Sequence, residues 1–92
     1  MDKITKRKLR DILATELKLE QPGFELEQLP GGRISGSVIS DSFDGMKDSD
    51  RQKQIWDALE KALGEEAIRL VGTILAYTGA EWNVELAEAD ER

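Results

Sequence analysis

Carboxylate side chains are the groups in this chain whose types and spacing could do chemistry. Four of them fall within ten residues: Asp41, Asp44, Asp48 and Asp50. Oxygen ligands at this density are typical of Ca²⁺ or Mg²⁺ sites, but the spacing lacks the D-x-D-x-D-G loop and its closing Glu. Together with Glu81 they could serve as general acids and bases, yet no nucleophile is paired with them. Turn formation and helix capping explain the aspartates better, so we expect no metal, no cofactor and no enzyme activity.

Histidine and cysteine are both absent from the 92 residues. Their absence excludes disulfides, thiolate nucleophiles, and the commonest neutral-pH base and metal ligand. The 19 acidic and 13 basic residues give a formal net charge of -6, which disfavours non-specific binding to phosphate backbones. No apolar run approaches the ~20 residues of a membrane span, and the start MDKITKRKLRDIL lacks the apolar core of a signal peptide. We therefore expect an intracellular, cytoplasmic protein.

The elements that must position these residues follow from apolar periodicity and turn signals. Over 3–19 the apolar residues recur at helical spacing, which predicts an amphipathic, mildly basic first helix. The alternating segments 24–29 and 33–41 flank the turn sequence LPGG and predict a β-hairpin. Gly36 interrupts the second of these strands and indicates a bulge or a close backbone approach.

Two capping-box patterns divide the second half of the chain. Residues 49–52 predict the start of an amphipathic helix, and Gly64 fits the left-handed position that ends one. The nearly continuous apolar run 68–77 predicts a buried strand. Residues 78–81 form the second capping box and start a last helix, after which we expect a frayed acidic tail over 84–92.

The resulting order is α-β-β-α-β-α. A hairpin makes the first two strands antiparallel, and the right-handed β-α-β crossover makes the third parallel to the second. The sequence thus predicts an α+β fold, a three-stranded mixed sheet covered by helices, as a single domain over 1–92. One core should contain the following side chains: Leu13, Trp56, Leu59, Leu63 and Ile74.

The segment ISDSFDG at 39–45 and the later motif YTxxEW at 77–82 together resemble the BolA family. The resemblance covers roughly residues 4–82, and its motif positions are Asp41, Phe43, Gly45 and Tyr77. It implies a fold like a class II KH domain. It also implies a regulatory interaction module, with transcription and the stress response as settings. Family members form complexes with monothiol glutaredoxins, in which BolA-type histidines help to hold an iron–sulfur cluster.

The family's ligand histidines are missing from this chain. Where the family reads Arg-His-Arg, the chain reads Arg51-Gln52-Lys53, and Leu70 stands where the most dependable histidine would be. The loop QLPGGRISG offers no donor either. Because iron sites need Cys or His donors in most biological clusters, we expect this chain to dock to a monothiol glutaredoxin without supplying a ligand.

We expect this docking at the end of the second strand and the starts of the two later helices. The candidate partner-binding residues are Arg33, Arg51, Lys53, Thr78, Glu81 and Trp82. Trp82 could equally be a core residue. The alternative is a KH-like nucleic-acid-binding transcriptional regulator that uses the basic side chains, although the sequence contains no GxxG loop of the kind KH domains use. An enzyme ranks third.

Overall fold

Three strands form one mixed sheet in the computed structural model, which describes residues 4–90. β1 (Gly23–Gln28) pairs antiparallel with β2 (Ile34–Ile39), and β2 pairs parallel with β3 (Val71–Tyr77). The first pairing is a hairpin and the second is a crossover through a helix, so β2 lies at the centre. The predicted α+β class and the order α-β-β-α-β-α are confirmed.

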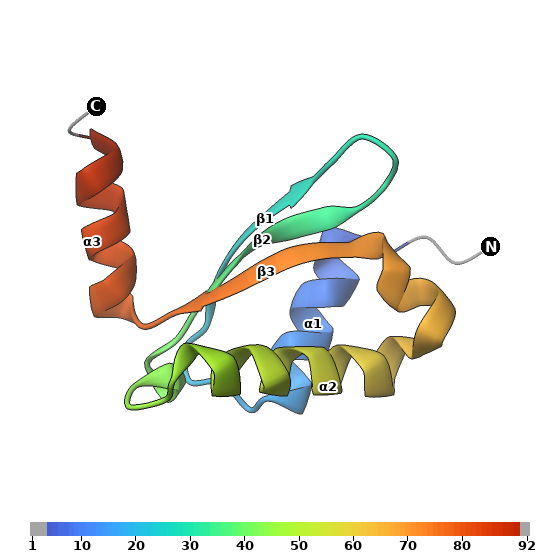
Figure 1. Ribbon diagram of the computed structural model, residues 1–92, viewed down its shortest axis with the longest axis horizontal. Helices are drawn as coiled ribbons and strands as arrows, with labels where there is room; N and C mark the ends of the chain where they lie inside the picture. Colours follow the sequence, from blue (N-terminus) through green and yellow to red (C-terminus); the bar gives the residue numbers. More distant parts are fainter. Residues whose placement is uncertain (1–3, 91–92) are drawn as a thin grey trace.

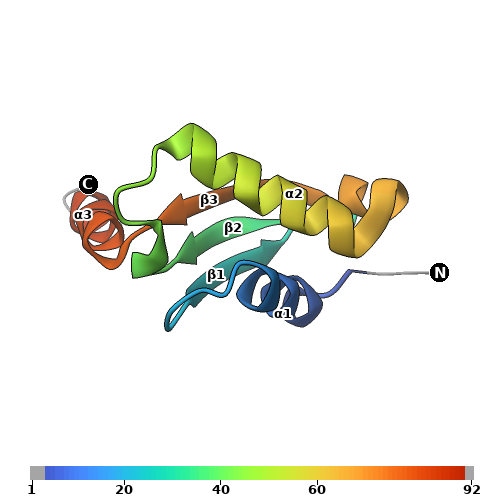
Figure 2. The same cartoon turned by 90° about the horizontal axis from the view of Figure 1, so that it is seen from below.

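Two helices cover one face of the sheet, and the third stands at its end. α1 (Lys6–Glu16) and α2 (Asp48–Ala67) lie next to each other on the same side of the strands (Figure 2). α3 (Gly79–Asp90) projects from the end of β3, away from both other helices (Figure 1). The opposite face of the sheet is uncovered by α1 and α2. None of the described helices is both long and apolar enough to cross a bilayer.

The core lies between the sheet and the two covering helices. Leu13, Leu59 and Ile74 are fully buried there, and Trp56 and Leu63 are partly buried against the same cluster. The predicted core is therefore confirmed. Burial of each fully enclosed aliphatic side chain contributes about 1.5–3 kcal/mol to folding.

Glycines shape the chain at two points. The β2–β3 register shifts between Ile34 and Gly36, and a Cβ on Gly36 would collide with the carbonyl oxygen of Glu25 on the neighbouring strand. The expected close backbone approach is thus real. At Gly64 the backbone has a φ of 82°, in the left-handed region, so the regular helix breaks there as predicted before one more helical turn follows.

The start of α2 corrects the first capping-box prediction. The helix begins at Asp48 after an N-cap at Lys47, which makes no side-chain cap hydrogen bond. Gln52 does not reach back to Ser49, because its amide donates instead to the carbonyl oxygen of Ile74 at 2.8 Å. A tertiary contact with β3 has replaced the local one.

Other boundaries also differ from those expected, and α1 ends at Glu16 rather than at residue 19. Residues Ile68–Leu70 form a short 3₁₀ helix, η2, because the chain must turn back toward the sheet after α2, so β3 starts at Val71. The strand expected over 33–41 ends at Ile39 and leads into a second 3₁₀ turn, η1 (Asp41–Phe43). The expected frayed tail over 84–92 is helical through Asp90, since its Glu, Leu and Ala residues favour helix. Positions 1–3 and 91–92, which include the ends of the predicted first helix and of the tail, lie outside the described residues.

Candidate functional site

Arg51 joins the beginning of α2 to the end of β3 and to α3. Its guanidinium donates to two backbone carbonyl oxygens, from Nε to Met46 at 3.1 Å and from Nη1 to Ala76 at 3.2 Å. It also binds both carboxylate oxygens of Glu81, with Nη1–Oε1 at 2.6 Å and Nη2–Oε2 at 3.2 Å. The side chain is only 9% exposed, and its charge lies 5.9 Å from the centre of the Phe43 ring. A buried cation with four hydrogen bonds to other parts of the chain fixes the relative positions of the elements it connects.

Glu81 is held in place by the second capping box, which the structure confirms. The Thr78 hydroxyl accepts from the Glu81 backbone N–H at 3.2 Å, and a Glu81 carboxylate oxygen accepts from the Thr78 N–H at 2.8 Å. Hydrogen bonds from Arg51 and from the Thr78 backbone lower the pKa of Glu81 from 4.5 to about 2. A carboxyl group this acidic stays ionised at neutral pH and cannot serve as a general acid there.

The family-motif residues surround this network. The Asp41 carboxylate accepts from the Gly79 N–H at 3.1 Å and so ties the η1 turn to the start of α3. Phe43 is buried in the core, and Gly45 turns the chain with a φ of 78°. Tyr77, at the end of β3, packs its ring 5.3 Å from that of Trp82. All four motif residues therefore lie around the junction of α2, β3 and α3 and help to form it.

Sequence reasoning missed the serine contacts beside this junction. The Ser40 hydroxyl donates to the Glu20 carbonyl at 2.8 Å, and the Ser42 hydroxyl accepts from the Glu20 N–H at 2.9 Å. These bonds fix the connection before β1 to the turn after β2. No sequence signal identifies them, because the partners are about twenty residues apart and serine is common in turns.

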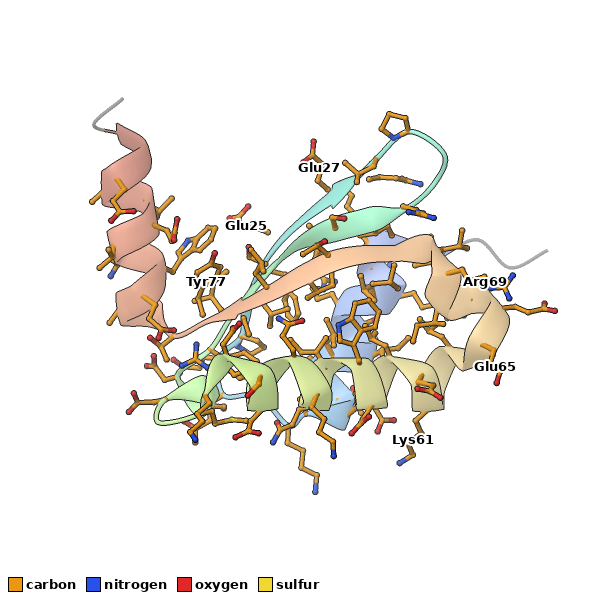
Figure 3. The ribbon with its side chains drawn as sticks, viewed as in Figure 1. Glu25, Glu27, Lys61, Glu65, Arg69 and Tyr77 are labelled. Atoms are coloured by element: carbon orange, nitrogen blue, oxygen red, sulfur yellow. The ribbon has the colours of Figure 1, made fainter. Side chains whose placement is uncertain are left out.

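A groove of about 440 Å³ opens where α2 begins, β3 ends and α3 departs. Its walls combine apolar and acidic side chains over the buried Arg51, and they are formed by Met46, Asp48, Ala76, Tyr77, Glu81, Val84 and Glu85. The Tyr77 side chain lies beside α3 (Figure 3). Burial, and then the carboxylates of Glu85, Asp48 and Glu81, raise the pKa of Tyr77, so its hydroxyl stays protonated at neutral pH.

The structure brings together only some of the predicted partner-binding residues. Arg51, Thr78 and Glu81 meet at the junction, with Trp82 half-buried next to Tyr77. Lys53 is exposed on α2, where its nearest acid is Asp57 at 4.0 Å. Arg33 is exposed at the hairpin, beyond the other end of β2.

The expectation for Arg51 needs a correction. Its guanidinium was expected at the surface, but it is buried and makes four hydrogen bonds within the domain. A long-range pairing with Glu81, thirty positions away, uses the charge that the sequence suggested was free. Arg51 therefore fixes the shape of the groove from within the domain.

Gln52 and Leu70, which the resemblance aligned with ligand histidines, make contacts within the fold. The Gln52 amide binds the edge of β3, and Leu70 in η2 packs against the core while half-buried. Within residues 4–90, no three carboxylate, imidazole or thiol groups are arranged to hold a metal ion.

Comparison with known proteins identifies the fold. No protein-family model matches the sequence. No curated protein matches it in sequence. A BolA protein homologue from Coxiella burnetii superposes with a TM-score of 0.67 at 17% identity, covering 87% of this chain and 97% of its own. BolA1 from Arabidopsis thaliana gives 0.63 at 20% identity, covering 85% and 98%. The BolA domain of SufE1 from Arabidopsis thaliana gives 0.58 at 24% identity, covering 85% and 98%. The chain has the BolA fold, as the motifs predicted.

Proposed function

We propose that this chain is a small, non-enzymatic BolA-like interaction module of the cytoplasm. It docks to a protein partner, such as a monothiol glutaredoxin, without itself supplying metal ligands. The docking surface is α3 together with the adjoining groove.

The exposure of α3 carries this proposal. The helix stands away from the sheet and from α1 and α2, and its side chains Val84 and Leu86 are 58% and 48% exposed. A helix of this length is marginal in water unless its apolar side chains are covered. Exposed apolar side chains beside a groove that also contains Tyr77 are typical of protein docking sites.

The rigid attachment of α3 supports the same function. Arg51, the Thr78–Glu81 capping box and the Tyr77–Trp82 ring contact all hold the first turn of the helix. A surface presented at a fixed angle loses less entropy when it binds than a mobile one does.

The chemistry of the chain favours docking over cluster ligation or catalysis. Gln52 and Leu70 replace the expected imidazoles, and neither an amide already bound to Ile74 nor an alkyl group is a ligand for iron. The groove's acid Glu81 is held ionised by Arg51. A KH-like role is disfavoured because the helix break at Gly64 leads into two exposed carboxylates, Glu65 and Glu66, where a phosphate-binding loop needs neutral or basic groups.

Direct binding to a purified monothiol glutaredoxin tests the docking surface. The variants Val84→Asp and Leu86→Asp place charge on exposed positions, so the fold should survive while affinity falls at least about tenfold. Ala62→Asp is the matched control, because Ala62 is exposed in the later part of α2, and that part of the helix runs away from α3 (Figure 1). Equal binding by all three variants would exclude α3 as the docking surface.

Spectroscopy of the loaded mixture tests the ligand assignment. With the unmodified chain, the cluster should take its ligands from the glutaredoxin and its thiol cofactor, so paramagnetic resonance and visible circular dichroism should lack a histidine signature. Leu70→His should introduce that signature if position 70 faces the cluster. A histidine-type spectrum with the unmodified chain is incompatible with a sequence that contains no histidine, and would mean that our choice of partner is wrong.

A further inference from the structure

The two edges of the sheet, β3 and β1, differ in whether side chains bond to their outward-facing backbone groups. On the outer edge of β3, the carbonyl oxygens of Ile74 and Ala76 accept hydrogen bonds from the α2 side chains Gln52 and Arg51. These contacts place α2 side chains across the edge and hinder the addition of another strand. Among the described residues, no such side-chain hydrogen bond reaches the outer edge of β1.

The backbone of β1 presents hydrogen-bonding groups at its outer edge. Leu29 donates its N–H to the carbonyl of Arg33 at 2.6 Å across the hairpin, so the backbone groups of Leu29 point toward the neighbouring strand. Because inward and outward groups alternate along an antiparallel strand, the N–H and C=O groups of Phe24 and Leu26 point away from β2. An extended segment could pair with these two residues.

A basic groove runs beside this edge. It has a volume of about 500 Å³ and is lined by Lys6, Arg7 and Arg10 of α1 and by Phe24 and Leu26 of β1. Arg10 lies 3.8 Å from Asp11 in a surface contact, which leaves its charge largely available. In a chain of net charge -6, three bases around an apolar floor are a local reversal of charge.

The other face of β1 has the opposite charge. Glu25 and Glu27 are exposed on the side of the sheet away from α2 (Figure 3). Side chains of a paired strand lie on the same face as their cross-strand neighbours, and opposite charges across a pair are stabilising. A strand added to β1 would therefore meet bases on one face and carboxylates on the other.

We propose that β1 is a strand-addition site for an extended segment of a partner protein, with acidic and apolar side chains facing α1 and basic side chains facing Glu25 and Glu27. Backbone pairing with Phe24 and Leu26 supplies affinity, and the alternating charges supply specificity. The groove beside β1 and the groove beside α3 have no lining residue in common, so the two surfaces can be tested separately.

A second copy of this chain is the wrong occupant. Pairing β1 with β1 would bring the bases of the two α1 helices together on one face and the Glu25 and Glu27 carboxylates together on the other. Like charges directly opposite each other are destabilising in a sheet. The charge pattern thus favours a foreign segment of complementary charge.

Two synthetic peptides test the proposal with the full chain. The first is acetyl-Thr-Glu-Lys-Ile-Lys-Glu-Thr-amide, whose alternate faces carry the required charges and whose symmetrical sequence serves either strand direction. The second replaces both Glu residues by Gln. We expect the first peptide to slow amide hydrogen exchange at Phe24 and Leu26, and to bind about tenfold more tightly than the second.

Charge variants complete the test. Lys6→Gln/Arg10→Gln should weaken binding of the first peptide about tenfold, whereas the matched control Lys8→Gln/Lys53→Gln, with the same change of net charge, should not. The proposal is overturned if neither peptide binds at ~1 mM, if both bind equally, or if the control pair weakens binding as much. It is also overturned if the exchange changes map to α3, or if the chain alone dimerises through β1.

Discussion

Neutralising Glu81 tests how the junction of α2, β3 and α3 is held. Glu81→Gln keeps a side chain that can accept from the Thr78 N–H, so the capping box survives and only the charge paired with Arg51 is lost. The variant should be less stable than the unmodified chain because the buried Arg51 cation then lacks its counter-charge.

The size of the effect follows from the pKa of Glu81. A fall from 4.5 to about 2 on folding corresponds to an upper limit of about 3 kcal/mol. The Glu81 side chain is 47% exposed, so solvent screens the interaction, and we expect about 1–2 kcal/mol at neutral pH. In a domain of this size, that lowers the Tm by about 4–16 °C.

The pH dependence provides the sharper test. The pKa is lower in the folded state, so the stabilisation is fully present above the unfolded pKa of 4.5 and is lost as pH falls through about 2. The difference in unfolding free energy between Glu81→Gln and the unmodified chain should shrink below about pH 4.5 in denaturant titrations.

A neighbouring carboxylate serves as the control. Glu85 lies on the same helix as Glu81, and no Lys or Arg among the described residues forms an ion pair with it. Glu85→Gln should therefore change the free energy of unfolding by no more than about 0.5 kcal/mol. The reasoning is refuted if the two variants melt alike at neutral pH, or if the Glu81→Gln difference does not diminish under acid conditions.

Three further outcomes are expected. Leu59→Ala should lower the unfolding free energy by about 2–5 kcal/mol in denaturant titration, because Leu59 is fully buried, and a loss under about 1 kcal/mol would contradict its place in the core. Gly36→Ala should destabilise by about 1–3 kcal/mol, because the new Cβ meets the Glu25 carbonyl; a neutral result would mean that the strands are further apart than described. DNA or RNA titrated at physiological salt should bind no more tightly than about 10⁻⁴–10⁻⁶ M, and submicromolar sequence-dependent binding would favour the KH-like alternative.

Local patterns in the sequence were sufficient to predict the order of helices and strands and the residues of the core. Alternation in 24–29 predicted β1, and the capping box of Thr78 and Glu81 predicted the start of α3. The buried positions Leu13, Leu59 and Ile74 followed from apolar periodicity. These predictions succeed because propensity, capping and amphipathicity act over a few residues and agree with the global fold.

Local signals failed wherever a distant group competed. Ser49 and Gln52 match a capping box, yet Gln52 binds Ile74 on β3, twenty-two positions away. Ile68 and Leu70 continue an apolar run but form a 3₁₀ turn, because the chain must reverse after Gly64. Sequence spacing alone does not contain the distances that decide these contacts.

The sequence by itself determined the class of the protein: an acidic α+β chain whose motifs resemble those of the BolA family, and which contains no histidine or cysteine. Only the tertiary structure decided which of its charged side chains are buried and which lie together at the surface. Arg51 is buried and paired with Glu81, while Lys6, Arg7 and Arg10 gather beside the edge of β1. The physical reason is that a charge acts through its surroundings, and desolvation, hydrogen-bond partners and neighbouring charges are set by residues brought together only on folding.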